Sequence, residues 1–240
     1  MNGFEVKTRT CFRWLLAAAF CFACVFMLFG GSKAYAEGEE LSVVPNQGYT
    51  YDTSAGELHI TQAGTYEISM LNVDTSSHQI NVDVDGVTLI LNNIKLNIPE
   101  DKPAIQFASS TNTTLDMVGE NQVESKVTNT GVIAAKTFEA TNIVFQSSQG
   151  TGKLTVIGKY SNTRSIGASN ITVKSGRLIT EGDGIMCHNF TIEGGELSMT
   201  SNNGTGSDGV YVLNKYVQTG GKVDIVCYRY GIYVDGGGTI

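Results

Sequence analysis

Three copies of one pattern lie near the C-terminal end of the chain, and they restrict its fold more than any other feature. The copies are residues 171–187, 190–212 and 216–234. Each contains a short alternating strand, a bend of small residues, a second alternating strand, a loop and a third strand that starts at glycine. Repeats of about 20–25 residues built from strands without helices are typical of a β-solenoid, in which each repeat forms one coil stacked on the previous one.

The same alternation begins earlier in the chain, at Gln79. Hydrophobic residues occupy every second position on both sides of the Asp85-Gly86 turn, so one side of each strand is predicted to face the core. We therefore predict an all-β fold in which residues 79–240 form the coils. Residues 37–78 are predicted to form an N-terminal cap that covers the first strand edge. The predicted inward residues are Val82, Val87, Leu89, Leu91, Ile94, Leu96 and Ile98.

The first 36 residues have the pattern of a secretory signal peptide. Lys7, Arg9 and Arg13 precede an uncharged apolar run from residue 14 to residue 29, and Ala34-Tyr35-Ala36 has the small-x-small form of a cleavage site. The apolar run is close to the minimum length for spanning a bilayer, so a membrane anchor is the alternative. The cleavage triplet favours removal, and we expect a secreted or cell-surface bacterial protein without membrane contact after cleavage.

The other end of the chain resembles an unfinished coil. Residues 236–240 look like the opening of a further repeat, and no capping pattern follows them. A last coil without a cap would expose a row of backbone donors and acceptors. We therefore expect the sequence to be part of a longer protein.

The excess of acidic over basic residues limits the kinds of molecule that the protein is expected to bind. Removal of residues 1–36 leaves 12 basic and 22 acidic residues, a net charge of −10, compared with −7 for the full chain. Such a surface disfavours nucleic acid and anionic membranes. It is compatible with a divalent cation or a polar glycan, and an acidic surface also simply promotes solubility.

Two cysteines, Cys187 and Cys227, remain after the predicted cleavage. Both occupy inward positions of their alternating strands. They lie in coils about two layers apart, or ~10 Å at the usual strand spacing, which exceeds the reach of a disulfide. We predict two buried thiols.

Asparagines recur immediately before strands, at Asn112, Asn142, Asn170 and Asn189. Asparagine tolerates tight bends, and stacked amides can hydrogen-bond to one another along the axis of a coil stack. We predict that these four residues have this structural role.

Several segments occur in a familiar order: GVTLILNNI at 86–94, PAI at 103–105, TTLDMVGEN at 113–121, GKLTVIG at 152–158 and then the glycine-rich coils. In this order the chain resembles the secreted bacterial carbohydrate-binding domain-containing β-helix family, whose fold is similar to that of pectate lyases. The resemblance covers about residues 79–240. It implies a single-stranded right-handed parallel β-helix, binding of a plant-type or acidic polysaccharide, and bound calcium. It does not imply catalysis.

Carboxylates in two neighbouring copies are candidate calcium ligands. Asp183 and Asp208 each stand immediately before the recurrent glycine, and Glu181 lies two residues before Asp183. Coils stacked ~4.8 Å apart bring equivalent positions together, and Ca²⁺ binds six to eight oxygens. The alternative is that each aspartate only hydrogen-bonds within its own turn.

Aromatic residues supply candidate contacts to carbohydrate. Tyr211 and Tyr233 occupy the same place in consecutive copies, between two inward residues, so both are predicted to point outward, one above the other. Tyr228 and Tyr230 flank Arg229 on a nearby loop, where the arginine could meet a uronate carboxylate bidentately. Flat aromatic faces can stack on sugar rings, although cross-strand pairing alone also explains such a ladder.

These features together favour a non-catalytic, secreted polysaccharide-binding module. A pectate-lyase-like enzyme is the alternative, and it would need a cationic base beside calcium. Arg164, Arg177 and Arg229 are available, but none recurs beside the acidic bend. A purely structural cell-surface or adhesin stalk is the third possibility.

Overall fold

The computed structural model describes residues 38–137, 140–158, 163–201 and 208–235. Every regular secondary-structure element within these ranges is a β-strand, which confirms the predicted all-β class. Within the same ranges, no helix is long and apolar enough to cross a membrane. The predicted signal peptide, residues 1–36, and the predicted unfinished coil, residues 236–240, lie outside the described residues.

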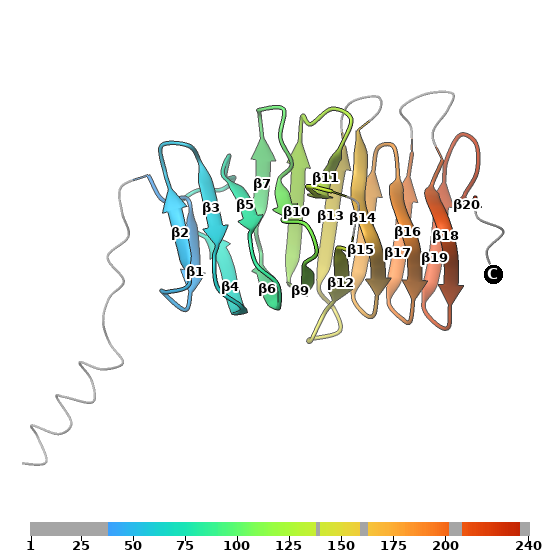
Figure 1. Ribbon diagram of the computed structural model, residues 1–240, viewed down its shortest axis with the longest axis horizontal. Helices are drawn as coiled ribbons and strands as arrows, with labels where there is room; N and C mark the ends of the chain where they lie inside the picture. The colour runs from blue at the N-terminus through green and yellow to red at the C-terminus, as the bar shows by residue number, and fades with distance from the viewer. Residues whose placement is uncertain (1–37, 138–139, 159–162, 202–207, 236–240) are drawn as a thin grey trace, which may run out of the picture. The chain divides into compact units, whose positions relative to one another are not determined.

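The strands form a β-solenoid with three faces, and a complete coil contributes one stretch of strand to each face (Figure 1). The first coil with a strand on every face contains β5 (Gln79–Val82), β6 (Val87–Asn92) and β7 (Lys95–Ile98). Each of them pairs in parallel with the equivalent strand of the following coil. We name the three faces after these strands. The parallel stack confirms the predicted solenoid, and its right-handed sense stays a prediction.

In the described residues the β7 face is a six-stranded parallel sheet, so six of the described coils have a strand on this face. Its members are β7, β10 (Glu120–Ser125), β13 (Lys153–Gly158), β15 (Arg177–Glu181), β17 (Glu196–Thr200) and β19 (Lys222–Val226).

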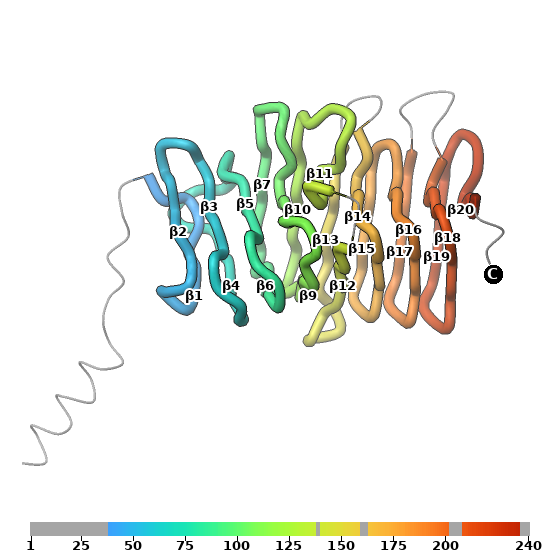
Figure 2. Tube along the Cα trace, in the orientation of Figure 1, coloured from blue at the N-terminus to red at the C-terminus, as the bar shows by residue number. Residues whose placement is uncertain are grey.

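The other two faces merge into one fourteen-stranded sheet, because β14 (Arg164–Val173), β16 (Ile185–Ile192) and β18 (Val210–Gln218) run across the corner between them. The β6 face consists of the second halves of these three strands with β4 (Gly64–Met70), β6, β9 (Asn112–Val118) and β12 (Asn142–Gln146). The β5 face consists of their first halves with β3 (Glu57–Ile60), β5, β8 (Ile105–Phe107), β11 (Gly131–Ala135) and β20 (Ile232–Val234). The coils follow one another in chain order along the stack (Figure 2).

Two antiparallel strands cover the N-terminal edge of the stack. β1 (Leu41–Val44) pairs with β4, and β2 (Tyr49–Asp52) pairs with β3. They satisfy the backbone groups that the first parallel strands would otherwise expose. β3 and β4, which the sequence interpretation assigned to the cap, already pair in parallel with β5 and β6.

The core consists of side chains stacked in register from coil to coil. On the β6 face one such column contains Leu89, Leu115, Phe145, Val173 and Ile192, all fully buried. All seven predicted inward residues are buried as well. Repeated stacking of this kind removes apolar surface from water and so stabilises the fold.

The two thiols differ in burial. Cys187 is fully buried, as predicted, and burial raises the pKa of its thiol to about 12, which makes it unreactive. Cys227 is only half-buried, so the prediction of a second buried thiol is wrong. Its inward neighbours Val223 and Ile225 are also only partly buried, because no further described strand packs on β19.

The predicted asparagine ladder is present at the corner between the β5 and β6 faces. The Nδ2 groups of Asn142, Asn170 and Asn189 each donate to the Oδ1 of the preceding asparagine, at 2.5, 2.6 and 2.6 Å. Asn112 Nδ2 in turn donates to Asp85 Oδ1 at 2.8 Å. This hydrogen bond is the main reason why the pKa of Asp85 lies below its usual value.

Substitution of Asn142 by alanine should break two rungs of this ladder. The amides of Asn112 and Asn170 would each lose a partner, so we expect the free energy of unfolding to fall by about 1–2 kcal/mol. Urea denaturation measures this change. Asn97→Ala on the exposed side of β7 is the matched control, and an equal loss for both variants would show that the ladder contributes nothing.

Candidate functional site

The outward residues of the β5 face form one continuous row. Parallel pairing places eight positions side by side across consecutive strands. Seven strand spacings of ~4.8 Å make the row about 34 Å long. It is polar at the N-terminal end, small in the middle and aromatic at the other end, and three of its members, Asn81, Ala134 and Gly167, are buried. We call it the outward row: His59, Asn81, Gln106, Ala134, Gly167, Met186, Tyr211 and Tyr233.

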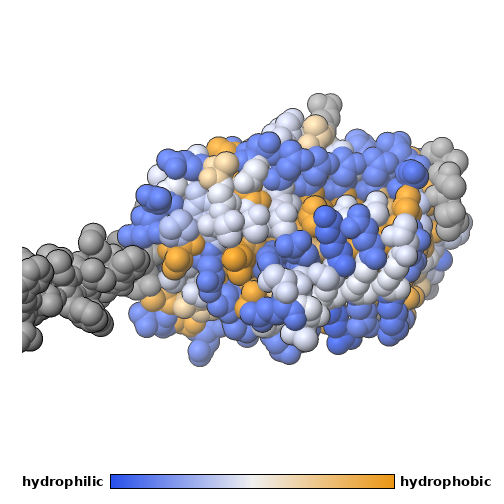
Figure 3. All heavy atoms as spheres, turned by 90° about the horizontal axis from the view of Figure 1, so that it is seen from below, coloured by the Kyte–Doolittle hydropathy of each residue, from blue (hydrophilic) through white to orange (hydrophobic). Residues whose placement is uncertain are grey.

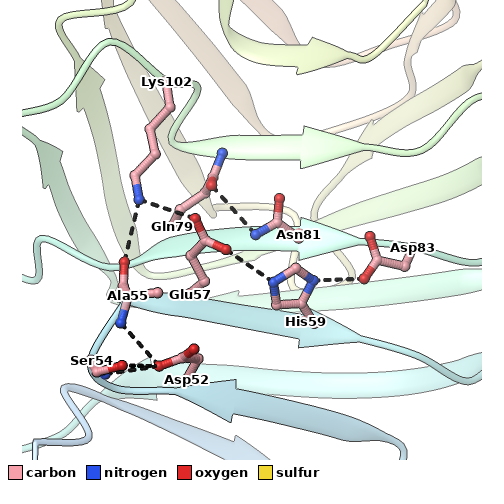
Figure 4. A network of polar contacts seen from close by, with 9 residues as sticks. All are labelled: Asp52, Ser54, Ala55, Glu57, His59, Gln79, Asn81, Asp83 and Lys102. Carbon is pink, nitrogen blue, oxygen red and sulfur yellow. Dashed lines mark hydrogen bonds and ion pairs between the residues drawn. The ribbon is translucent and has the colours of Figure 1, made fainter.

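At the polar end, two carboxylates hold His59 between them (Figure 4). His59 Nδ1 lies 2.7 Å from Asp83 Oδ2, and Nε2 lies 3.2 Å from Glu57 Oε2. The other oxygen of Glu57 accepts from Lys102 Nζ at 3.3 Å. Lys102 also donates to the carbonyl of Ala55 at 3.4 Å, which ties the loop before β8 to the turn before β3. The charges of this cluster are thus satisfied within the protein.

Two amides continue the polar end on β5. Gln79 and Asn81 point outward between the inward residues Ile80 and Val82, yet each is only 4% exposed. Asn81 Nδ2 donates to Gln79 Oε1 at 3.4 Å. In the next coil, Gln106 is paired in register with Asn81 and is half-buried. Of these three amides, Gln106 has the most open surface from which to offer donors and acceptors to a polar ligand.

The stability of the polar end is expected to depend on pH through His59. Burial lowers the pKa of this imidazole, but its hydrogen bonds with Asp83 and Glu57 outweigh burial, and the net pKa is raised. A raised pKa in the folded state stabilises the fold fully below the unfolded pKa of about 6.5, and this contribution disappears as the pH rises through the folded pKa.

His59→Gln removes this contribution. The difference in Tm between the native chain and the variant should therefore be larger at pH 6 than at pH 8. Thermal unfolding at the two pH values measures it. A difference that is the same at both pH values, or larger at pH 8, would show that the imidazole is not held in its charged form.

The middle of the row is bordered by Arg164, which begins β14. It is paired in register with Gly131 and is half-buried. Burial has the largest influence on the pKa of this guanidinium and lowers it, whereas the nearby Asp183 and Tyr211 act in the opposite direction. A cation therefore lies within electrostatic reach of Asp183.

The aromatic end is a stack of rings. Tyr211 and Tyr233 lie one above the other as predicted, with ring centroids 5.3 Å apart and planes inclined by 23°. Tyr230 adds a third ring, 5.4 Å from Tyr233. The hydroxyl of Tyr211 donates to Asp235 Oδ2 at 3.0 Å. Because each ring covers part of the next, the broad faces of Tyr211 and Tyr233 are less available to a sugar than the sequence suggested.

The rings with the most open surface are those of the loop that follows β19. Tyr228 is 66% exposed and Tyr230 is 51% exposed. The guanidinium carbon of Arg229 lies 5.3 Å from the ring centroid of Tyr230, so the arginine covers part of one face of that ring. Tyr228 is therefore the best-placed of the four predicted tyrosines to stack on a sugar ring.

Arg229 already binds a carboxylate of its own chain. Its Nε donates to Asp208 Oδ1 at 2.9 Å and its Nη2 donates to Asp208 Oδ2 at 2.6 Å. Only 9% of the Asp208 side chain is exposed. Arg229 thus forms the bidentate contact that was expected with a uronate, but its partner is the carboxylate of Asp208.

The same pairing bears on the predicted calcium ligands Glu181, Asp183 and Asp208. Both oxygens of Asp208 accept hydrogen bonds from Arg229, and Asp183 lies near Arg164. In the part of the chain that the structure describes, no group of three or more His, Cys, Asp or Glu side chains could hold a metal ion. Asp208 would have to leave Arg229 before it could bind Ca²⁺, so calcium at these residues stays a prediction.

The β7 face has a different character. Equivalent positions on successive strands carry Glu120, Lys153, Arg177, Glu196 and Lys222. Lys153 pairs with Glu120 at 3.0 Å, and Glu196 pairs with Lys222 at 3.2 Å and with Arg177 at 3.4 Å. Water screens the attraction between such exposed charges, so these ion pairs contribute little to the stability of the fold. Seen from below, the surface is largely hydrophilic, with hydrophobic side chains in separate small spots (Figure 3).

Sequence reasoning missed the polar end of the row, because it assigned residues 37–78 to a cap. One signal was available: the outward pair Glu57 and His59 recurs 22 residues later as Gln79 and Asn81. The recurrence places polar residues at equivalent positions of adjacent parallel strands, as the register of β3 and β5 confirms.

A scan against protein families matches residues 54–237 to the carbohydrate-binding domain-containing protein family. The chain belongs to this family. The matched region contains the whole outward row, from His59 to Tyr233, and the tyrosines and arginine of the loop after β19. Searches of curated proteins and of solved structures returned no match. The family and the solenoid fold together support a polysaccharide-binding module.

Proposed function

We propose that this protein is a secreted, non-catalytic polysaccharide-binding module and that a glycan chain lies along the outward row. The observation that carries the proposal is the row itself. It combines the half-buried amide of Gln106 towards one end with exposed tyrosines beside the other end, along a β5 face about 34 Å long. A surface of that length suits several consecutive sugar units rather than one.

The residues of the row match the chemistry of a sugar chain. Amides such as Gln106 both donate and accept hydrogen bonds, as sugar hydroxyls do. An exposed ring such as Tyr228 offers a flat apolar face to the C–H side of a pyranose. The parallel ladders fix the backbone beneath Gln106, so little conformational entropy is lost when this amide binds.

Secretion is part of the proposal and rests on the pattern of residues 1–36. Cleavage after Ala36 would leave Glu37 as the first residue. N-terminal sequencing of the exported protein should therefore begin at Glu37. Retention of the intact N-terminus in a membrane fraction would instead support the anchor alternative.

Affinity electrophoresis tests the binding function. The full chain, expressed so that cells can process its N-terminus, is run through gels that contain cellulose derivatives, xylan, galactan or polygalacturonate, with calcium or with chelator. We expect retardation by at least one glycan and no new reducing or unsaturated ends. Loss of retardation in chelator would support calcium dependence, release of unsaturated products would identify a lyase, and no retardation on a broad panel would favour the structural stalk.

A further inference from the structure

We infer that the outward row selects uncharged glycans over uronate-containing ones. The inference rests on the proposed function and specifies its ligand. The resemblance to the β-helix family implied a plant-type or acidic polysaccharide. The ion pairs along the row favour the uncharged class, because His59, Lys102 and Arg229 are already engaged by carboxylates of the same chain.

Two basic side chains at the polar end show this pairing. His59 lies between Asp83 and Glu57, at 2.7 and 3.2 Å, and Lys102 pairs with the second oxygen of Glu57 at 3.3 Å. Lys102, and His59 in its protonated form, thus face two carboxylates. A uronate that entered here would have to displace Glu57 or Asp83 and would meet their repulsion.

The aromatic end repeats the arrangement. Arg229 forms a bidentate pair with Asp208, and the Asp208 side chain is only 9% exposed. Exchange of this partner for a uronate would leave a nearly buried carboxylate without its counter-ion, which is strongly unfavourable. Arg164 has Asp183 as an electrostatic neighbour. Asp235, which accepts from Tyr211, adds a further negative charge beside the stacked rings.

Apart from Lys136, the groups that remain for a ligand are uncharged. Gln106 is a half-buried amide and Tyr228 presents an exposed ring, whereas Gln79 and Asn81 are only 4% exposed. The exposed Lys136 follows β11 at the place where Asp83 follows β5, so it lies beside the row and is the cation with the most open surface in that part of it. Lys126 follows the end of β10. The chain as a whole has a net charge of −7, which repels polyanions at longer range.

Matched pairs of glycans test the inference, with one backbone in a neutral and an acidic form. Suitable pairs are carboxyl-reduced polygalacturonate with polygalacturonate, and hydroxyethyl cellulose with carboxymethyl cellulose. We expect the neutral member to retard the chain at a concentration at least tenfold lower than its acidic counterpart. Stronger retardation by the acidic members would overturn the inference while leaving the proposed function intact. Absence of retardation by any member or by a wider set of neutral glycans would overturn both.

A charge variant makes the test specific to the row. Asp208→Asn keeps the shape of the side chain but releases the guanidinium of Arg229, so it should at least triple the relative retardation by polygalacturonate. Glu196→Gln is the control, because it releases Arg177 and Lys222 on the β7 face. An equal gain for both variants would mean that overall charge, and not the pairing along the row, sets the preference.

Discussion

Replacement of Gly184 by alanine is expected to lower the free energy of unfolding by about 3 kcal/mol or more. Gly184 has a φ of +81° and precedes β16, so an L side chain there is strained in itself. In addition, a Cβ at this position would lie 2.1 Å from the carbonyl oxygen of Gly209 and 2.5 Å from that of Asp208. Both atoms are backbone of the next coil, and Gly209 O accepts from Ile185 N at 2.9 Å. The coils would have to move apart.

Gly150 provides a control that separates strain from collision. It also has a positive φ, +77°, but a Cβ there would meet no atom within 4 Å. Gly150→Ala should therefore cost only the conformational strain, about 1–2 kcal/mol. Urea denaturation of both variants compares the two costs. If Gly184→Ala were no worse than Gly150→Ala, the close stacking of the coils at this bend would be refuted.

The second large effect is expected at the centre of the core. Phe145 is fully buried between Leu115 and Val173 of the neighbouring coils. Phe145→Ala should reduce the free energy of unfolding by about 3–5 kcal/mol, since it removes buried apolar surface and leaves a cavity that rigid coils cannot close. Such a loss is a large part of the stability of an ordinary domain.

The neighbouring residue supplies the comparison for this substitution. Val144 lies on the same strand and is half-buried on its outer side. Val144→Ala should cost about 1 kcal/mol or less when measured by the same denaturation. Similar losses for Val144→Ala and Phe145→Ala would contradict the assignment of inner and outer sides to β12.

Regular features of the fold could be predicted because they depend on local alternation. Inward positions such as Leu89 and Leu96 follow from period two within one strand. The asparagine ladder followed from asparagine placed before one strand after another. The tyrosine pair followed from two consecutive copies of the repeat, in which Tyr211 and Tyr233 are aligned by the glycines before them.

The complete row could not be predicted, because its members are unevenly spaced. The intervals between successive residues of the row are 22, 25, 28, 33, 19, 25 and 22, since the loops between coils differ in length. The recurrence of residues 57–59 at 79–81 indicates the first pair, but only the observed pairing of strands aligns Asn81 with Gln106 and the rest of the row. The contact between Arg229 and Asp208 could not be predicted from the sequence either, because the two residues are 21 positions apart and a loop brings their side chains together.

The most direct test of the account is to remove one amide from the row and a matched amide from another face. Gln106 and Gln122 belong to the same coil and are both half-buried, but Gln106 faces outward on the β5 face and Gln122 on the β7 face. Affinity electrophoresis in hydroxyethyl cellulose, xylan and galactan compares Gln106→Ala and Gln122→Ala with the native chain. We predict about fivefold weaker retardation for Gln106→Ala, corresponding to ~1 kcal/mol for one hydrogen bond, and no change for Gln122→Ala. Undiminished binding by Gln106→Ala together with a loss in Gln122→Ala would contradict the assignment of the glycan to the outward row.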